Sequence, residues 1–245
     1  MQSIARAMNI IHILSEQSTE HGMSISALAK ASDLPLSTLH RILKAMIKQR
    51  MVEQDEQTKL YRLGSIWLEY GLKSYDSMDY ITTIRPELDR LSKEVNESVY
   101  LSKPLHVESI VIERIDSEAN PIRMYDQLGI RIPLHIGAAN KAMLAAMSPE
   151  KSLPLIEQLV APSEQQAFKE ELLKIEQQHY AESHGERTDG TSSVAAPILN
   201  GLGEVIGAVS IGFVTFTATP ERIQQLIQHV RITGETISTK MGYRR

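Results

Sequence analysis

The sequence contains no cysteine among its 245 residues. This absence excludes disulfide bonds, thiolate metal sites and a cysteine nucleophile, and it fits a protein of the reducing cytosol. The apolar run VIGAVSIGFVTF is shorter than the roughly 18 residues that a membrane-spanning helix needs. The N-terminus also lacks the apolar core and cleavage site of a secretory signal. We therefore expect a cytoplasmic protein with no membrane partner.

Motifs of the common catalytic and cofactor sites are missing as well. There is no H-E-x-x-H motif, no phosphate-binding loop and no dinucleotide fingerprint, and Ser192 and Ser193 do not lie in a G-x-S-x-G elbow. His179 and His184 are five residues apart, which is weak support for a metal site. Glu186 is expected on an exposed loop. The sequence thus predicts no catalytic residue, no metal and no cofactor.

The charge is distributed unevenly along the chain. Residues 1–75 contain 9 Lys and Arg against 7 Asp and Glu, whereas residues 76–245 contain 17 against 23. The segment LPLSTLHRILKAMIKQRM, residues 34–51, contains four basic residues and no acidic one. A basic segment on an acidic protein favours a polyanionic partner for that segment alone, although such a cluster is more often a solvated helix face.

Three short helices are predicted at the N-terminus. Apolar residues at steps of three and four predict a helix over residues 3–15. Ser26 is a plausible N-cap of a second helix, and Pro35 suits the first position of a third. In that third helix an apolar stripe leaves one polar and basic face, made of Ser37, Thr38, His40, Arg41, Lys44 and Lys48.

A hairpin is predicted directly after the third helix. The strand-like runs MVEQ and KLYRL flank the polar turn DEQT, and Gly64 ends the unit. Three helices followed by a hairpin are the ingredients of a winged helix-turn-helix, whose last helix enters the major groove of DNA. The alternative is a three-helix module for protein interaction. The residues expected to contact DNA are Ser26, Ser37, Thr38, His40, Arg41, Lys44, Lys48, Lys59 and Arg62.

This segment resembles the DNA-binding domain of IclR-type bacterial transcriptional regulators. The combination of LPLSTLHRIL with YRLG at a fixed distance carries the resemblance. Leu36 departs from the family, which often has a basic residue after the helix-opening proline. HIGAANKAMLAAM, SSVAAPILNGLGEVIGAVSIGF and TPERI resemble the family's effector-binding domain.

The resemblance implies an α+β architecture. A winged helix-turn-helix over residues 1–65 is expected to be joined by a helical linker, residues 66–78, to an effector-binding and oligomerisation domain over residues 79–245. That domain is expected to contain a mixed antiparallel sheet with flanking helices, and PIRMYDQLG, residues 121–129, reads as a weaker strand. In the family the linker region helps to pair subunits.

The resemblance also implies a pocket for a small-molecule effector. The loop HIGAAN runs into a helix whose free N–H groups suit a carboxylate, although Gly137 and the alanines can equally serve tight packing. Tyr100 can be a half-buried strand residue. Because Ser183 and Ser193 stand where an acidic residue and a cysteine can occur, we expect a less acidic pocket. The residues expected to bind the effector are Tyr100, Gly137, Ala138, Ala139, Asn140, Ser183, Ser193, Ser210 and Gly212.

The function that follows is a ligand-responsive regulator of transcription. Its expected partners are a double-stranded DNA operator, a small effector with a carboxylate, and further copies of the chain in a dimer or a dimer of dimers. The resemblance favours a repressor of a catabolic operon. The alternatives are a metabolite-binding or enzymatic module whose N-terminal helices serve assembly, and a regulator that has lost its ligand.

Overall fold

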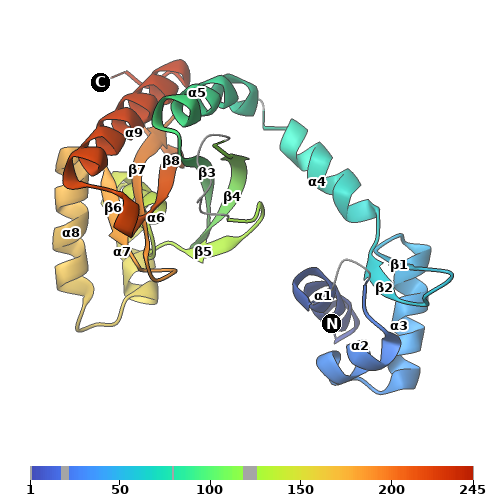
Figure 1. The fold of residues 1–245 in the computed structure, drawn as a ribbon. Coiled ribbons are helices and arrows are strands. Elements are labelled where there is room, and N and C mark those ends of the chain that lie inside the picture. Colours follow the sequence, from blue (N-terminus) through green and yellow to red (C-terminus); the bar gives the residue numbers. More distant parts are fainter. Residues whose placement is uncertain (1, 18–21, 79, 118–125, 245) are drawn as a thin grey trace. The chain divides into compact units, whose positions relative to one another are not determined.

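The computed structural model describes residues 2–17, 22–78, 80–117 and 126–244 (Figure 1). The chain forms two compact units, Met1–Asp79 and Tyr80–Arg245. Among the described residues, no helix combines the length and the hydrophobicity needed to cross a bilayer.

The N-terminal unit contains three helices, a two-stranded hairpin and a fourth helix. Its elements are α1 (Gln2–Gln17), α2 (Ile25–Ser32), α3 (Leu36–Lys48), β1 (Val52–Gln54), β2 (Tyr61–Leu63) and α4 (Ile66–Asp76). The apolar sides of α1, α2 and α3 meet in one core that includes Ile10, Leu28 and Leu39, each fully buried. The predicted winged helix-turn-helix is therefore confirmed as a fold.

Two helix starts differ from the sequence prediction. Ser24, not Ser26, is the N-cap of α2, and its hydroxyl accepts a hydrogen bond from the Ala27 N–H at 3.2 Å. Met23 forms a bridge with Tyr61 in the hairpin, so the chain is still extended just before Ser24. Ser26 consequently lies in the first turn of α2. Pro35 is the N-cap of α3 and not its first helical residue.

Tight contacts hold the hairpin against α3 and α4. The indole Nε1 of Trp67, at the start of α4, donates to the Met51 carbonyl at 2.8 Å. Gly64 follows β2, and a Cβ atom there would lie only 2.0 Å from the carbonyl oxygen of Arg50. The close approach explains why the hairpin ends in glycine.

The C-terminal unit is built on a six-stranded antiparallel sheet with the order β5-β4-β3-β8-β7-β6. Its strands are β3 (Ser98–Leu105), β4 (Glu108–Ile115), β5 (Arg131–Pro133), β6 (Ala181–His184), β7 (Thr191–Leu199) and β8 (Val205–Val214). Its helices are α5 (Tyr80–Val95), α6 (Ala138–Ala146), α7 (Pro149–Leu159), α8 (Gln165–Gln178) and α9 (Pro220–Lys240), with a short 3-10 turn η1 (Thr215–Thr217).

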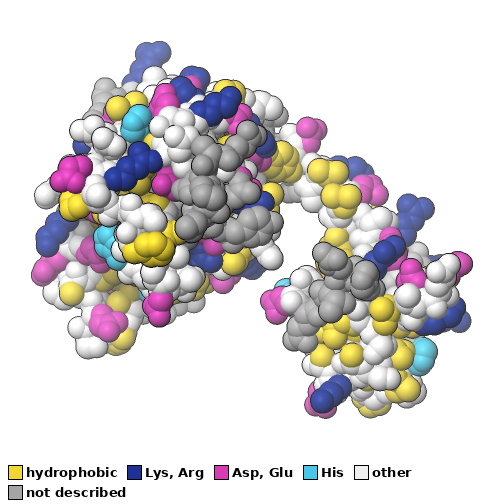
Figure 2. All heavy atoms as spheres, in the orientation of Figure 1, with side chains coloured by type: hydrophobic (Ala, Val, Ile, Leu, Met, Phe, Trp, Pro, Cys, Tyr) yellow, Lys and Arg dark blue, Asp and Glu magenta, His cyan; other side chains and the backbone are white. Residues whose placement is uncertain are grey.

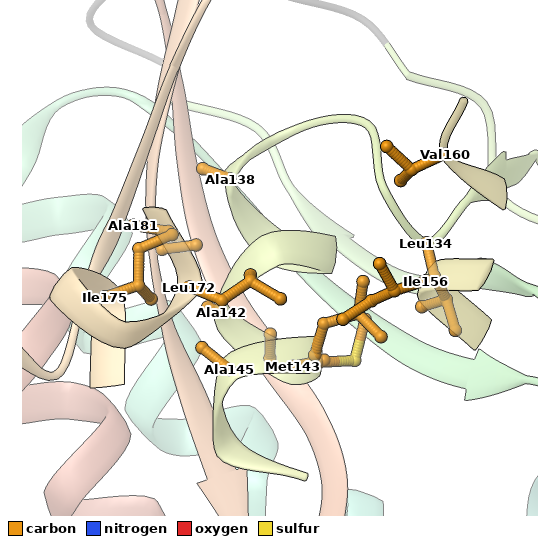
Figure 3. Close-up of a cluster of buried hydrophobic side chains, with 13 residues drawn as sticks. Leu134, Ala138, Ala142, Met143, Ala145, Ile156, Val160, Leu172, Ile175 and Ala181 are labelled. Atoms are coloured by element: carbon orange, nitrogen blue, oxygen red, sulfur yellow. The ribbon is translucent and has the colours of Figure 1, made fainter. Parts of the chain in front are cut away.

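Helices cover both faces of this sheet. Ala195 of β7 packs in the cluster that α6 forms with α7 and α8, in which Met143, Ile156 and Leu172 are labelled in Figure 3. The next residue, Ala196, faces Gly234 of α9. Because successive strand side chains point to opposite faces, α6 and α9 lie on opposite sides of β7. Helix α5 packs beside α9 (Figure 1).

A local cap marks the start of α9, whereas one predicted strand is not formed. The Thr219 hydroxyl accepts from the Arg222 N–H at 3.2 Å, so Thr219 is the N-cap ahead of Pro220. Of the weaker strand predicted over residues 121–129, residues 121–125 lie outside the described residues, and the remainder precedes β5 without being a strand.

The β6 strand covers only part of β7. It pairs with Ser192–Ala195, and β7 continues beyond it to Leu199. In that extension Pro197 has no N–H, and the N–H of Leu199 donates to the hydroxyl of Ser238 on α9 at 3.0 Å.

Candidate functional site

The candidate DNA interface is the solvent face of α3. Leu39, Leu43 and Met46 bury the opposite side of this helix in the core. The exposed residues follow the three- and four-residue spacing of one helix face, namely Ser37, His40, Arg41, Lys44 and Lys48. Thr38 is half-buried at the margin, and Leu36 is exposed where the helix begins.

The cations of α3 are available to an external anion. Arg41, Lys44 and Lys48 are exposed and have no carboxylate partner within the part of the chain that the structure describes. Free cations on an exposed helix face can bind phosphate oxygens or the O6 and N7 atoms of guanine. The face therefore has both the shape and the charge that a major groove requires.

Hydrogen bonds to Asp55 hold the hairpin turn next to α3, and of the two cations predicted to bind DNA there, only Arg62 has a carboxylate partner among the described residues. The Asp55 carboxylate accepts from the N–H groups of Thr58 and Gln57, at 2.7 and 3.0 Å. These bonds, with the Thr58 hydroxyl, lower the pKa of Asp55. Lys59 has a left-handed backbone and an exposed side chain. Arg62 is paired with Glu53 at 3.5 Å, so it would have to exchange that carboxylate for a phosphate.

The second site is a pocket in the C-terminal unit, between the start of α6 and the sheet. Its volume is about 590 Å³, including space open to solvent. All nine residues expected to bind the effector line it: Tyr100, Gly137, Ala138, Ala139, Asn140, Ser183, Ser193, Ser210 and Gly212.

Strand register explains how residues so distant in sequence meet. Ser183 of β6 lies opposite Ser193 of β7, which lies opposite Gly212 of β8. Two residues further along, Ser210 of β8 lies opposite Tyr100 of β3. Residues paired across strands share a face, and so do residues two apart on one strand. These side chains therefore form one polar floor beneath α6. Burial is the main cause that raises the pKa of the Tyr100 phenol.

The start of α6 forms the opposite wall and has free hydrogen-bond donors. The N-cap is Gly137, which has no side chain to bond the first turn. Within the described residues no acceptor meets the N–H groups of Ala138, Ala139 and Asn140. The Asn140 amide donates to the carbonyls of Ile132, Pro133 and Ile136, while its buried Oδ1 has no partner. Such a set can bind a ligand that both accepts and donates hydrogen bonds.

A carboxylate from the β6–β7 loop is bonded to the same helix start. Glu186 Oε2 accepts from the Gly137 N–H at 2.7 Å, and its Oε1 lies 2.6 Å from Nζ of the buried Lys141. Glu171 lies 2.7 Å from the same ammonium group. Burial alone would lower the pKa of Lys141, but the two carboxylates outweigh it and the pKa is raised. The pKa of Glu186 is lowered, because its bonds to Lys141 and Gly137 outweigh the opposing effect of burial.

The neighbouring loop residue contributes a cation. Arg187 Nη1 lies 2.8 Å from the Asp126 carboxylate, and both side chains are only partly exposed, at 28% and 21%. Asp126, Glu186 and Arg187 all line the pocket. The expectation of a less acidic pocket considered only Ser183 and Ser193, and two further carboxylates, Asp126 and Glu186, line the pocket from other segments. The β6–β7 loop places Glu186 there, and the segment before β5 places Asp126.

The serine and histidine side chains near the end of β6 do not form a catalytic or metal-binding site in the described structure. The Ser192 hydroxyl is shared between His184 Nδ1 at 3.0 Å and Thr215 at 2.8 Å. Glu182 is 3.7 Å from His184, too far for a hydrogen bond that would orient the ring. In the described ranges no three His, Cys, Asp or Glu side chains could hold a metal ion together.

Comparison with known proteins places both units in one family. The family model described as "Bacterial transcriptional regulator IclR C-terminal" matches residues 72–239. The model described as "IclR helix-turn-helix domain" matches residues 3–56. The first alone spans more than half of the chain.

Individual relatives match over at least 90% of their length. The HTH-type transcriptional regulator KdgR of Escherichia coli (strain K12) is 28% identical over 249 residues, covering 98% of this chain and 94% of KdgR. The HTH-type transcriptional repressor AllR of the same strain is 26% identical over 248 residues, covering 98% of this chain and 90% of AllR.

Solved structures show the same fold. The crystal structure of Thermotoga maritima IclR gives a TM-score of 0.79 at 23% identity, over 99% of this chain and 100% of that one. An IclR homologue from Microbacterium hydrocarbonoxydans, crystallised with 4-hydroxybenzoate, gives a TM-score of 0.80 at 20% identity, over 98% of both chains.

Proposed function

The chain belongs to the IclR family of bacterial transcriptional regulators, and on that premise we propose that it represses a catabolic operon until a small organic acid binds. Membership makes it a DNA-binding regulator with an effector-binding domain and not an enzyme. The match of residues 3–56 to a helix-turn-helix also argues against the alternative in which the N-terminal helices serve only assembly. In this proposal the protein acts in the cytoplasm.

One observation carries the proposed effector class. The start of α6 presents three N–H groups without acceptors to a pocket whose floor is lined by hydroxyl groups. A helix N-terminus of this kind favours a carboxylate, because its free N–H groups and its dipole both attract negative charge. The homologue from Microbacterium hydrocarbonoxydans, which was crystallised with a benzoic acid derivative, supports the same class.

The proposed reading of DNA rests on α3. In this proposal Ser37, Thr38, His40 and Arg41 contact base edges, Lys44 and Lys48 contact phosphates, and Ser26, Lys59 and Arg62 add flanking contacts. Two copies of the chain would place two such helices in successive major grooves about one turn of DNA apart. The repressor named among the relatives supports the sign of regulation.

The effector would act by its difference in affinity for two states of the protein. A ligand shifts an equilibrium only as far as it binds one state better than the other. We propose that the acid prefers the state whose reading heads do not fit the operator. The operator must then weaken binding of the acid by the same factor.

The test combines DNA binding with ligand screening. Fluorescence anisotropy would measure the affinity of the full chain for the DNA upstream of its own gene, with and without each of a panel of organic acids. A true effector should raise the thermal unfolding temperature of the protein and weaken this DNA complex. If no acid changes either quantity, the proposed effector class is wrong.

A further inference from the structure

We propose that Arg187 is the residue that makes the pocket select a carboxylate over a neutral molecule of the same shape, by exchanging Asp126 for the acid group of the effector. This inference rests on the proposed function, because it specifies how the same pocket recognises its ligand. Neither residue was among those that the sequence assigned to the pocket.

The start of α6 attracts a carboxylate, but the donors there do not exclude a neutral ligand of the same shape. Backbone N–H groups and hydroxyl groups also donate to the neutral oxygen of an amide or an alcohol. Of the described residues that line the pocket, Arg187 is the only lysine or arginine. A guanidinium group binds the two oxygens of a carboxylate in a fork and loses that fit with a neutral amide. Discrimination by charge therefore points to Arg187.

Arg187 already holds a carboxylate in this structure. Its Nη1 atom lies 2.8 Å from Oδ2 of Asp126. The structure thus contains, from the chain itself, the kind of group that an effector would bring. An entering acid would add a third carboxylate beside Asp126 and Glu186, so the exchange requires one of these two to leave its partner.

Asp126 is the carboxylate that can leave more easily. Glu186 uses both oxygens, one on the Gly137 N–H and one on the buried Lys141. Within the described part of the chain, the Asp126 carboxylate has a single bond, of 2.8 Å, to a partly exposed partner, and ion pairs of that kind contribute little to stability. Its main chain stays in place, because Arg114 donates to the Asp126 carbonyl at 3.0 Å. Only the side chain needs to turn toward solvent.

Glu186 keeps the exchanging arginine in position. It is the residue directly before Arg187, and its two bonds fasten that part of the loop to the start of α6. The loop is bounded by Gly185 and Gly190, both with a left-handed backbone. The guanidinium group can therefore swing from Asp126 to a ligand while its main chain remains fixed.

The experiment replaces each member of this ion pair in turn. The two replacements should change the affinity for an acid in opposite directions. Its probes are matched acids and amides: lactate and lactamide, glycolate and glycolamide, gluconate and gluconamide, and 4-hydroxybenzoate and 4-hydroxybenzamide. Thermal shift selects the acids that stabilise the full-length wild type, and calorimetric titration then gives the affinity of each selected acid and of its amide.

The inference predicts a specific pattern among variants. Arg187→Gln should lower the affinity for the selected acid by about 10- to 100-fold and leave the affinity for its amide unchanged. Asp126→Asn should raise the affinity for the acid by about 3- to 10-fold, because it removes the carboxylate that competes for Arg187. Arg187→Lys keeps the positive charge but cannot bind both carboxylate oxygens in a fork. Its affinity for the acid should lie between those of wild type and Arg187→Gln. Circular dichroism and operator binding verify that each variant is folded.

An unrelated ion pair of the same unit provides the control. Lys151 and Glu204 are 3.0 Å apart and do not line the pocket. Lys151→Gln and Glu204→Gln should not change the affinity for the acid or the amide. This control separates a general effect of lost ion pairs on stability from a specific effect on recognition.

The remaining outcomes are distinguishable. The inference is overturned if an acid binds but Arg187→Gln retains the preference for acid over amide. It is also overturned if Asp126→Asn and Arg187→Gln change the affinity for the acid in the same direction. In both cases the proposed function stands. If no acid stabilises the wild type or releases its DNA, the proposed effector class fails and the inference falls with it.

Discussion

Individual side chains determine how the two candidate sites bind charge. Arg41 is exposed on α3 without a carboxylate partner among the described residues, whereas Arg62 on the hairpin is paired with Glu53. An unpaired guanidinium group gives up no internal bond when it binds DNA. Arg41 should therefore contribute more to operator affinity than Arg62.

Replacement of Arg41 tests the DNA interface directly. Arg41→Ala should weaken operator binding by about 1–3 kcal/mol, the usual value for a lost base contact, while the domain stays folded. The measurement is a gel-shift titration together with circular dichroism. Lys174→Ala, which removes an exposed cation of α8 in the other unit, is the control and should leave affinity unchanged. Equal affinity of wild type and Arg41→Ala would contradict the interface.

The carboxylate of Glu186 predicts a dependence of stability on pH. Its pKa is lowered in the folded protein, because its bonds to Lys141 and Gly137 outweigh burial. A carboxylate of this kind stabilises the fold above its ordinary pKa, and the contribution is lost as pH falls through the folded value. Wild type should therefore exceed Glu186→Gln in unfolding free energy at pH 7, and the difference should shrink below about pH 4.5. Urea titrations across this range measure it, and a constant difference would refute the assignment.

At the scale of helices and strands, close packing depends on small residues at defined positions. Gly234 of α9 faces β7, and a Cβ atom there would lie 2.8 Å from Cβ of Ala196 and 3.2 Å from the Pro197 carbonyl oxygen. Gly71 of α4 has no atom within 4 Å of its hypothetical Cβ. Both glycines are helical, so their surroundings alone should decide the effect of alanine.

The two glycines make a matched pair of predictions. Gly234→Ala should destabilise the protein by about 1–3 kcal/mol, because overpacking has to move α9 away from β7. Gly71→Ala should stabilise it by up to about 1 kcal/mol, the gain in helix propensity. Chemical denaturation of both variants provides the values. Stabilisation by Gly234→Ala would show that α9 is not packed as described.

Elements with a local signal could be predicted from sequence, and those fixed by tertiary contacts could not. The start of α9 follows from Thr219 and Pro220 because capping is a local interaction. The cap of α2 was misplaced because two serines lie two residues apart, and the bridge between Met23 and Tyr61 decides between them. The nine residues that the sequence analysis expected to bind the effector all line the pocket. Asp126, Glu186 and Arg187 were not expected there, because their positions depend on how loops fold across the sheet.

At the scale of the whole molecule, the linker helix offers a surface for a second copy. No residue of α4 is buried, and Leu68, Tyr70 and Leu72 are 67%, 57% and 58% exposed. Hydrophobic side chains are visible on the surface of α4 in Figure 2. A helix with an exposed apolar surface is stabilised when a partner covers it. This surface supports the proposed pairing of subunits through the linker.

Charged substitutions on α4 test that pairing. The double variant Leu68→Lys and Leu72→Lys should convert a dimer into a monomer and weaken binding to a two-site operator by at least tenfold, because the two reading heads no longer bind together. Analytical ultracentrifugation and gel shift measure these effects. Leu202→Lys, at the 84% exposed tip of the turn between β7 and β8, is the control. A double variant that remains a dimer would place the interface elsewhere.

The part of β7 that extends past β6 has a consequence for solubility. An uncovered strand is a template on which another chain can add a strand of its own, and repeated addition leads to fibrils. Here Pro197 offers no N–H to an incoming chain, and the Leu199 N–H is already occupied by the Ser238 hydroxyl. A strand added at this stretch would therefore find no N–H donor at Pro197 or Leu199, which protects the part of β7 that β6 leaves uncovered.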